Sequence, residues 1–372
     1  MKRNLKKSSK ETELADILFP SATEEEQTES ILSIPPEQRR LHTDTYDFTV
    51  STLLDNIKRG SIYIPEFQRK YVWSTAQASR LVESLIIQCP IPVIYLSQEK
   101  DERQSVIDGN QRLQSLLKFV NNEFALSGLT AYPELEGLLY QQLDARFQRH
   151  IMNRTLRCMV ILKDTHPQVK FDVFERLNTG SVKLNAQELR HGLYFGKLMK
   201  LAAKLAKLKK WQDILDITHD KRMKSEELVI RFLALQYDWN NYKKPLSLFL
   251  NTFSDKYRDL SLEKEAEFTV EFERTVDNVI SLFGSLVFKV FDESQHVLSK
   301  FNAALFDAEM IAAGSYRNRL RVKAVTRKNI HKGLVKLFEE EDFQKTITRA
   351  TSDDKQLKKR IEAVKSMLKR HV

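Results

Sequence analysis

The sequence predicts an α+β fold: a small mixed sheet with flanking helices, followed by a mainly α-helical domain. The segment 93–96 is continuously apolar, which is typical of a buried strand, and 156–162 is a second, longer apolar segment that is also expected to be a strand. Between them, 105–107 runs into an Asp-Gly turn and then directly into a helical pattern. After residue 162 the apolar residues recur with a helical period, so no further strand is expected.

The chain divides into four parts on composition and periodicity. Residues 1–45 combine a basic opening, an acidic stretch and several prolines without any period, and are expected to form a disordered leader. We expect an α/β domain over 46–166, a helical domain over 167–316 and a basic helical segment over 317–372. No apolar run is long enough for a membrane helix or follows the opening as a signal peptide, so we expect a cytoplasmic protein that does not contact a membrane.

The first elements of the α/β domain follow from local signals. A helical period begins at Phe48 and stops at Gly60. The apolar segment 62–64 is cut by Pro65, and an irregular loop then leads to Ser74, whose hydroxyl is suited to cap the next helix. The continuous strand at 93–96, the strand–turn–helix at 105–122 and the strand at 156–162 complete the sheet.

The later elements are expected to be helical. The spacing of Asn185 and Glu188 predicts a capping box at a helix start. A helix over 197–210 is expected to bury one leucine stripe and expose its lysines, although such a face could also lie on DNA or a membrane. The stripe consists of Leu198, Leu201, Leu205 and Leu208.

Composition excludes several classes of protein. With 42% hydrophobic and 30% charged residues, the chain is neither disordered, fibrous nor membrane-spanning. Its two cysteines, Cys89 and Cys158, rule out a disulfide scaffold and a four-cysteine zinc module, and both are expected to be buried thiols. The phosphate-loop, dinucleotide, zinc-protease and serine-hydrolase motifs are also missing.

Positive charge is concentrated at the end of the sequence. Residues 317–372 contain 17 Lys+Arg and 7 Asp+Glu, which accounts for the whole net charge of +10. Such a block favours DNA as a partner through counterion release. A solvated, lysine-rich helical face explains it equally well.

One turn has the features of an anion site. Arg112 lies in the first turn of a helix that begins directly after a strand and Gly109, where helix N–H groups and the helix dipole attract phosphate. Asp108 beside it would repel a phosphate unless its charge were offset. Mg²⁺ could offset it, a salt bridge with Arg112 or Arg69 could do the same, or Asp108 could simply form a tight turn.

A second cluster lies in the loop after Pro65. Gln68 and Arg69 are polar in an apolar setting, which favours a functional role. Tyr71 and Trp73 follow closely, and they could either stack on a base or anchor the loop on the core.

Three ordered segments together carry a resemblance. They are IPEFQRKYVW at 64–73, VIDGNQRLQSL at 106–116 and FERLNTGSVKLNAQELR at 174–190. Over about 48–205 the chain resembles the GmrSD-type restriction-system domain family, whose fold is similar to the ParB and sulfiredoxin superfamily. The resemblance implies a ParB/sulfiredoxin-like α/β domain.

The resemblance also implies roles for individual residues. Asp108, Gly109, Gln111 and Arg112 match the family's Asp-Gly-Gln-Gln-Arg signature, which is associated with nucleotide binding and hydrolysis, and Asn110 replaces the first glutamine with a shorter amide. The family also has a Phe-Gln-Arg motif that faces the same ligand pocket, and Gln68 and Arg69 match it. The family's Leu-Asn-Thr-Gly loop and the acidic residue after it would shape the far wall of this pocket, and they are matched by Asn178, Gly180 and Glu188. A helix C-cap explains Asn178 equally well, and a capping box explains Glu188.

The first functional hypothesis is a nucleotide-dependent enzyme with an NTP as substrate or ligand. Its catalytic residues would be Asp108, Gln111, Arg112 and Gln68, and Asp108 would hold Mg²⁺. Phosphate contacts would come from Arg69, Gly109, Asn110, Arg112 and Asn178. The histidines after residue 190 are isolated, so we expect no His-Asn-His nuclease domain here and a partner nuclease subunit instead.

Three alternatives remain open. The chain could be a non-hydrolysing, ParB-like DNA-binding module that uses its basic final segment. It could be a metal-dependent nuclease acting through Asp108 and Glu188, or an interaction scaffold that binds no nucleotide. The nucleotide, the DNA sequence and the oligomeric state are left open by the sequence.

Overall fold

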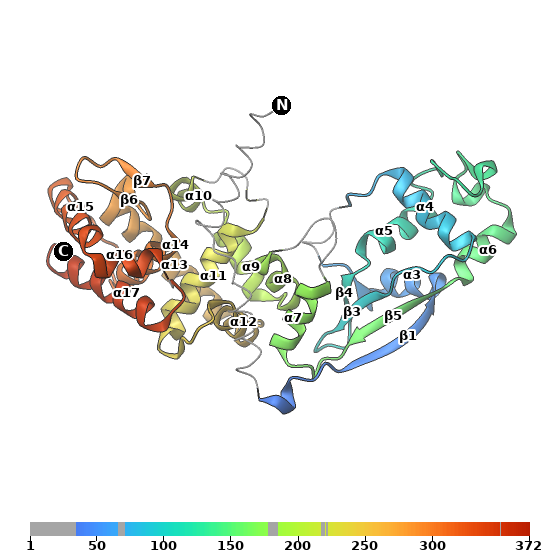
Figure 1. Ribbon diagram of the computed structural model, residues 1–372, viewed down its shortest axis with the longest axis horizontal. Helices are drawn as coiled ribbons and strands as arrows, with labels where there is room; N and C mark the ends of the chain where they lie inside the picture. The colour runs from blue at the N-terminus through green and yellow to red at the C-terminus, as the bar shows by residue number, and fades with distance from the viewer. Residues whose placement is uncertain (1–34, 66–70, 178–184, 217–219, 221, 350) are drawn as a thin grey trace. The chain divides into compact units, whose positions relative to one another are not determined.

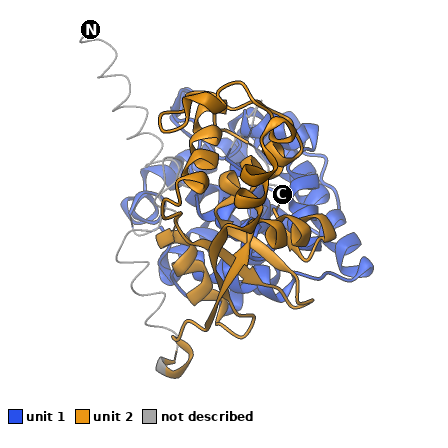
Figure 2. Ribbon diagram, turned by 90° about the vertical axis from the view of Figure 1, so that its right-hand side faces the viewer, with its two compact units in different colours: residues 1–34, 185–372 blue, residues 35–184 orange. Residues whose placement is uncertain are grey.

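The computed structural model describes residues 35–65, 71–177, 185–216, 220, 222–349 and 351–372. They form two compact units, Pro35–Leu184 and Asn185–Val372 (Figure 2), called here the N-terminal and C-terminal units. Figure 1 shows an α/β arrangement in the first and helices in the second. None of the described helices combines the length and apolar character needed to cross a membrane.

The N-terminal unit contains a five-stranded mixed sheet with strand order β1-β5-β3-β4-β2. β5 runs antiparallel to β1 and parallel to β3, while β4 runs antiparallel to β3 and parallel to β2. The strands are β1 (Thr43–Thr49), β2 (Ile62–Tyr63), β3 (Ile94–Gln98), β4 (Gln104–Asp108) and β5 (Thr155–Ile161). The predicted mixed sheet is therefore confirmed.

Helices share one apolar core with this sheet (Figure 1). They are α3 (Val50–Arg59), α4 (Thr75–Ile86), α5 (Asn110–Val120) and α6 (Ala145–Asn153), with the short 3-10 turns η3 (Pro133–Leu135) and η4 (Tyr140–Gln142). The turn η1 (Pro36–Gln38) precedes β1, and α7 (Pro167–Leu177) follows β5. Ser74 caps α4 as expected, in a capping box with Gln77. Leu53, Val82 and Leu116, from α3, α4 and α5, are each fully buried in this core.

Strand β1 corrects the sequence interpretation around Phe48. The sequence placed Phe48 at a helix start, but it lies in β1, opposite Leu156 of β5. The helix begins two residues later, where the Thr49 hydroxyl accepts a hydrogen bond from Thr52 N at 3.1 Å. β1 is an edge strand with mostly exposed side chains, so its polar sequence lacks the apolar signal of a buried strand.

The C-terminal unit is helical apart from one small hairpin, as the sequence predicts. Helix α14 lies at its centre, nearly all of its residues are buried, and it packs against α11, α13 and α17. The helices are α8 (Ala186–Leu193), α9 (Lys197–Leu205), α10 (Lys209–Leu215), α11 (Lys224–Asp238), α12 (Leu246–Lys256), α13 (Leu262–Phe283), α14 (Ala303–Gly314), α15 (Ala324–Glu339), α16 (Glu341–Thr348) and α17 (Asp354–Lys369), with η5 (Trp239–Asn241) and η6 (Gly284–Leu286).

Two details of this unit differ from expectation. The helix expected over 197–210 is two helices, α9 and α10, and Leu198, Leu201 and Leu205 are buried on α9 as predicted. A hairpin, β6 (Val290–Phe291) with β7 (Val297–Ser299), was not expected, because strands of two and three residues are too short to show a period.

The two cysteines lie in different environments. Cys158 on β5 is buried, and burial raises the pKa of its thiol to about 12. Cys89 is exposed, which corrects the expectation that both thiols are buried. It follows α4 at the point where the helix ends, so its apolar neighbours in the sequence do not enclose it.

A closed ionic network joins three helices of the C-terminal unit. Asp307 on α14 accepts hydrogen bonds from Arg231 at 2.6 Å to each carboxylate oxygen and from Arg360 at 2.7 Å. The side chains of Asp307 and Arg360 are each only 1% exposed. Arg360 belongs to the basic segment 317–372, so one of its positive charges lies inside the fold.

Candidate functional site

The candidate site lies where β4 passes into α5. Asp108 ends the strand, and Gly109 precedes the first helical residue, Asn110. Gly109 adopts a left-handed backbone with φ of 98°, and a Cβ atom there would lie 3.0 Å from Cγ1 of Ile94. The left-handed backbone therefore favours glycine here, and a larger residue would also press against the Ile94 side chain. No side chain caps this helix start, an arrangement that favours anions through the helix dipole.

Arg112 is buried one turn into α5 and bonds to protein oxygens. Its Nη2 donates to Asp108 Oδ2 at 2.8 Å and to the Val93 carbonyl at 3.2 Å, and its Nη1 donates to the Pro92 carbonyl. Burial lowers the pKa of Arg112, and the charge of Asp108 opposes that change. Arg112 therefore ties α5 to the chain entering β3.

The Asp108–Arg112 salt bridge offsets the negative charge of Asp108. Of the alternatives considered, the structure contains this ion pair and the Asp-Gly turn together. The side chain of Asp108 is 50% exposed, whereas that of Arg112 is 11% exposed. The carboxylate thus has a fixed cationic partner on one side and solvent on the other.

Gln111 holds the loop that precedes α4. Its Oε1 accepts hydrogen bonds from Val72 N at 2.9 Å and Trp73 N at 3.3 Å. Tyr71 bonds through its hydroxyl to Ser115 at 2.9 Å, and Trp73 packs against the apolar core. These contacts attach both aromatic side chains to the domain, and base stacking by them stays a prediction. Sequence reasoning missed the contact of Gln111, since no pattern links a glutamine to backbone 38 residues earlier.

Several predicted residues fall outside the described part of the chain. They are Gln68, Arg69, Asn178 and Gly180. The meeting of Arg69 with Arg112 in one pocket therefore stays a prediction. Asn110 is described, and its Oδ1 accepts a hydrogen bond from Gln114 at 2.8 Å.

Glu188 forms the capping box that its spacing predicts. Its Oε2 accepts from Asn185 N at 2.6 Å, while Asn185 Oδ1 accepts from Glu188 N at 2.8 Å. Arg222 lies 3.2 Å from the same carboxylate. Burial raises the pKa of Glu188. These contacts give Glu188 a structural role at the start of α8.

The donor atoms near Asp108 limit what kind of metal could bind there. Across the residues that the structure describes, no three His, Cys, Asp or Glu side chains come together as a metal site. A single half-exposed carboxylate suits Mg²⁺ when phosphate oxygens and waters complete the octahedron. Asp108 therefore fits Mg²⁺ that arrives with a nucleotide, rather than a metal held by protein alone.

Comparison with known proteins matches part of the chain to a family. Residues 50–195 match the family model described as the N-terminal domain of the GmrSD restriction endonuclease. This range includes the β4–α5 junction, the anchored loop residues and α8. No curated protein and no solved structure matches the chain.

Proposed function

We propose, from the match of residues 50–195 to the N-terminal domain of the GmrSD restriction endonuclease, that the chain is a component of a restriction or anti-phage defence system. In this proposal it binds a nucleoside triphosphate, hydrolyses it and associates with DNA in the cytoplasm. It acts as the sensor or regulatory part, and a separate partner subunit supplies the nuclease.

The junction of β4 and α5 carries this proposal. A left-handed glycine brings the start of an uncapped helix next to a half-exposed carboxylate that is already paired with a buried arginine. Phosphoryl transfer depends on positioning and charge stabilisation more than on covalent chemistry by the protein. A helix start, a carboxylate and an arginine are chemically sufficient for this task.

The proposal gives each group a role. The backbone at Gly109 and Asn110 contacts the phosphates, and Asp108 holds Mg²⁺ together with phosphate oxygens. Arg112 fixes Asp108 and offsets its charge. Gln111 Oε1 is engaged by the loop backbone, so we assign the orientation of the attacking water to Gln68. Arg69 and Asn178 remain the further phosphate contacts expected from the sequence.

Thermal stability in the presence of nucleotides tests the proposal. A ligand that binds only the folded protein raises its melting temperature, so a panel of nucleoside triphosphates is scanned with and without Mg²⁺. We expect one nucleotide to raise the melting temperature in the presence of Mg²⁺, and phosphate release to follow. If no nucleotide shifts it, the proposal fails.

A matched pair of variants tests whether the Mg²⁺-dependent rise in melting temperature depends on Asp108. Asp108→Asn should abolish the Mg²⁺-dependent part of the shift. Asp101→Asn is the control, because Asp101 is also half-exposed, at 53%, and bonds to Arg103 at 2.7 Å on the turn between β3 and β4. Equal losses in both variants would contradict a site at Asp108.

A second candidate, a DNA-binding module without hydrolysis, is favoured by one observation. The hydrogen bonds of the Arg112 guanidinium end on protein oxygens, so fewer of its donors face a triphosphate. Under this reading DNA affinity falls steeply with salt. Charge removal at exposed Lys332, Lys336 and Lys358 should reduce the slope while the nucleotide panel gives no shift.

A further inference from the structure

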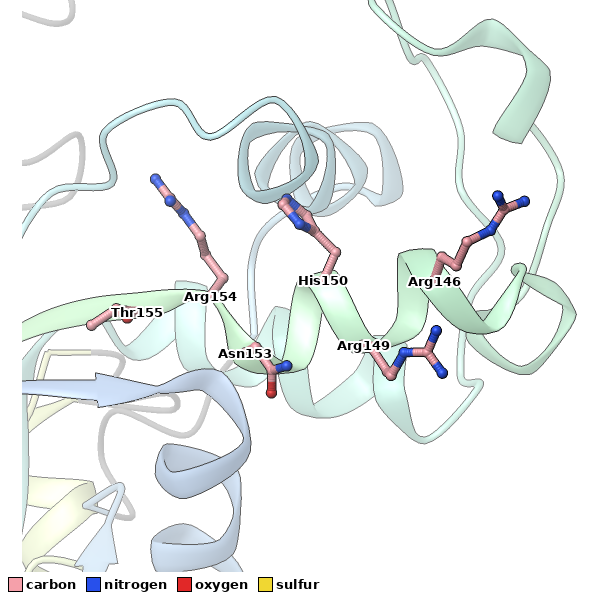
Figure 3. A pocket seen from close by; sticks show the side chains of 6 residues that line it. All are labelled: Arg146, Arg149, His150, Asn153, Arg154 and Thr155. Carbon is pink, nitrogen blue, oxygen red and sulfur yellow. The ribbon is translucent and has the colours of Figure 1, made fainter.

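Helix α6 of the N-terminal unit presents a row of cationic side chains at a pocket (Figure 3). Positions 146, 149, 150 and 153 repeat at the spacing of one helix face, and the next two residues extend that face into β5. The pocket has a volume of about 400 Å³ and is lined by Arg146, Arg149, His150, Asn153, Arg154 and Thr155.

The opposite face of α6 fixes this orientation. Ile151 is fully buried, and Phe147 packs against the core and meets the ring of Tyr132 edge-on at 6.2 Å. Asp144 caps the helix by accepting from Arg146 N at 2.8 Å. The two faces of a helix have fixed directions relative to each other, so burial of the apolar face of α6 directs its polar face toward solvent.

The charges of the pocket do not cancel. Arg146 is paired with Asp144 at 3.0 Å, and this partner lowers the pKa of Asp144 to about 2. Within the described ranges, Arg149 and Arg154 have no ion pair with an acidic side chain. The charge of Arg149 also helps to lower the pKa of Asp144, so one carboxylate interacts with two of the three arginines and the pocket keeps a net positive charge.

Two nitrogens at the pocket are buried without a partner. Arg154 Nη2 donates to the Gln88 carbonyl at 3.0 Å, which fixes its side chain. Its Nε and the Nε2 of His150 have no hydrogen-bond partner among the residues described. Both atoms are closed to solvent, so they do not contact a ligand themselves, and the donors available at the pocket are those of the exposed side chains Arg146, Arg149, Asn153 and Thr155.

We propose that this pocket binds the phosphate backbone of double-stranded DNA. Arginine forks suit phosphate oxygens, and the amide and hydroxyl of Asn153 and Thr155 add neutral donors. The six lining residues are all polar and run along α6 from its first turn to the start of β5, and contacts from such side chains to phosphate position a protein on DNA without reading its sequence. None of the six lining residues belongs to the proposed nucleotide site or to the basic segment 317–372.

DNA binding by the full chain tests the proposal through anisotropy of a labelled duplex over a series of salt concentrations. Arg149 is exposed and its charge interacts with Asp144 without a salt bridge among the described residues, so we expect its replacement to leave the fold intact. Arg149→Glu should weaken binding by about tenfold at low salt, and Arg149→Ala should lower the salt slope by about one.

Lys100→Glu is the matched control. Lys100 is exposed on the turn after β3, and β3 runs parallel to β5 with Ser97 opposite Ile161. It therefore lies at the opposite end of β5 from Thr155. We expect it to change DNA affinity by less than about twofold. If it weakens binding as much as Arg149→Glu, or if Arg149→Glu has no effect, the proposal is overturned.

The nucleotide assay separates this proposal from the proposed function. Arg149→Glu should retain the Mg²⁺-dependent thermal shift, and Asp108→Asn should retain DNA affinity. Free ATP as competitor should not displace the duplex at concentrations that saturate the thermal shift. Displacement at those concentrations would show that the pocket takes a free nucleotide, and would contradict DNA as its ligand.

Discussion

The two units each contain a buried arginine bound to an aspartate, but only one of these clusters is open. In the C-terminal unit, Asp307 and both of its arginines are enclosed between helices, and the carboxylate is 1% exposed. In the N-terminal unit, Arg112 is equally fixed, yet Asp108 is 50% exposed. The closed cluster stabilises packing, while the open one can still meet a ligand.

This difference follows from where the acids lie. Asp307 is in the middle of α14, which neighbouring helices surround. Asp108 is the last residue of a strand, at the edge where a chain turns outward into a helix. The same ion pair therefore has different consequences at a helix centre and at a strand end.

The largest expected effect comes from breaking the closed cluster. Asp307→Asn leaves two buried guanidinium groups without their counter-charge, which should cost about 3–5 kcal/mol of unfolding free energy. Urea unfolding of the full chain measures it. Asp342→Asn, an exposed acid paired with Lys359, should change stability little, and a comparable loss there would remove the distinction between closed and surface pairs.

Breaking the open cluster should cost less. Arg112→Ala leaves the Pro92 and Val93 carbonyls without their donor, and we expect a loss of about 2–3 kcal/mol. Asp108→Asn should be milder, since the amide oxygen of asparagine can still accept the hydrogen bond from Arg112 at a position that is half-open to water. Thermal unfolding of both variants orders them, and a larger loss for Asp108→Asn would contradict the assignment of Arg112 as the structural member of the pair.

Glu309 lies two residues from Asp307 on the same helix, and it should make the stability of the C-terminal unit depend on pH. It is fully buried, accepts from Phe288 N at 2.7 Å and has no cationic partner among the described residues, and burial raises its pKa well above the usual range. An acid whose folded pKa is raised gives stability that is present at low pH and lost as pH rises.

The expected loss is at most about 1.4 kcal/mol per pH unit, beginning above the unfolded pKa of about 4.5. Glu309→Gln should flatten this slope in unfolding experiments between pH 5 and pH 8, values chosen around that pKa. An identical slope in the wild-type protein and Glu309→Gln would show that another group titrates.

The smallest expected effect concerns Gln111. Gln111→Ala removes two hydrogen bonds to loop backbone and should cost about 1 kcal/mol, with faster hydrogen exchange at Val72 and Trp73. Gln114→Ala on the same helix is the control, since it bonds to Asn110 within α5. Unchanged exchange at Val72 and Trp73 in Gln111→Ala would show that other contacts hold the loop.

Local signals predicted much of the fold. The apolar strands β3 and β5, the Ser74 cap and the Asn185–Glu188 capping box depend on neighbours in sequence, and the structure contains all of them. The polar edge strand β1 and the hairpin β6–β7 were missed because pairing partners, not local composition, define them.

The site shows the same division between local and distant information. The glycine turn at 108–112 was evident from the sequence. The binding of Arg112 to carbonyls about twenty residues earlier, and of Gln111 to the loop before α4, required the tertiary structure. Sequence patterns therefore located the turn, whereas the tertiary structure shows which polar atoms of Arg112 and Gln111 are already hydrogen-bonded within the protein.

The placement of the two cysteines makes the native chain suitable for site-specific labelling. Cys89 is exposed and directly follows Gln88, whose carbonyl binds Arg154 beside the α6 pocket, whereas Cys158 is shielded within the sheet. A maleimide dye would therefore attach to a single thiol without any engineered mutation. Its fluorescence would report from the immediate vicinity of the surface that we assign to DNA.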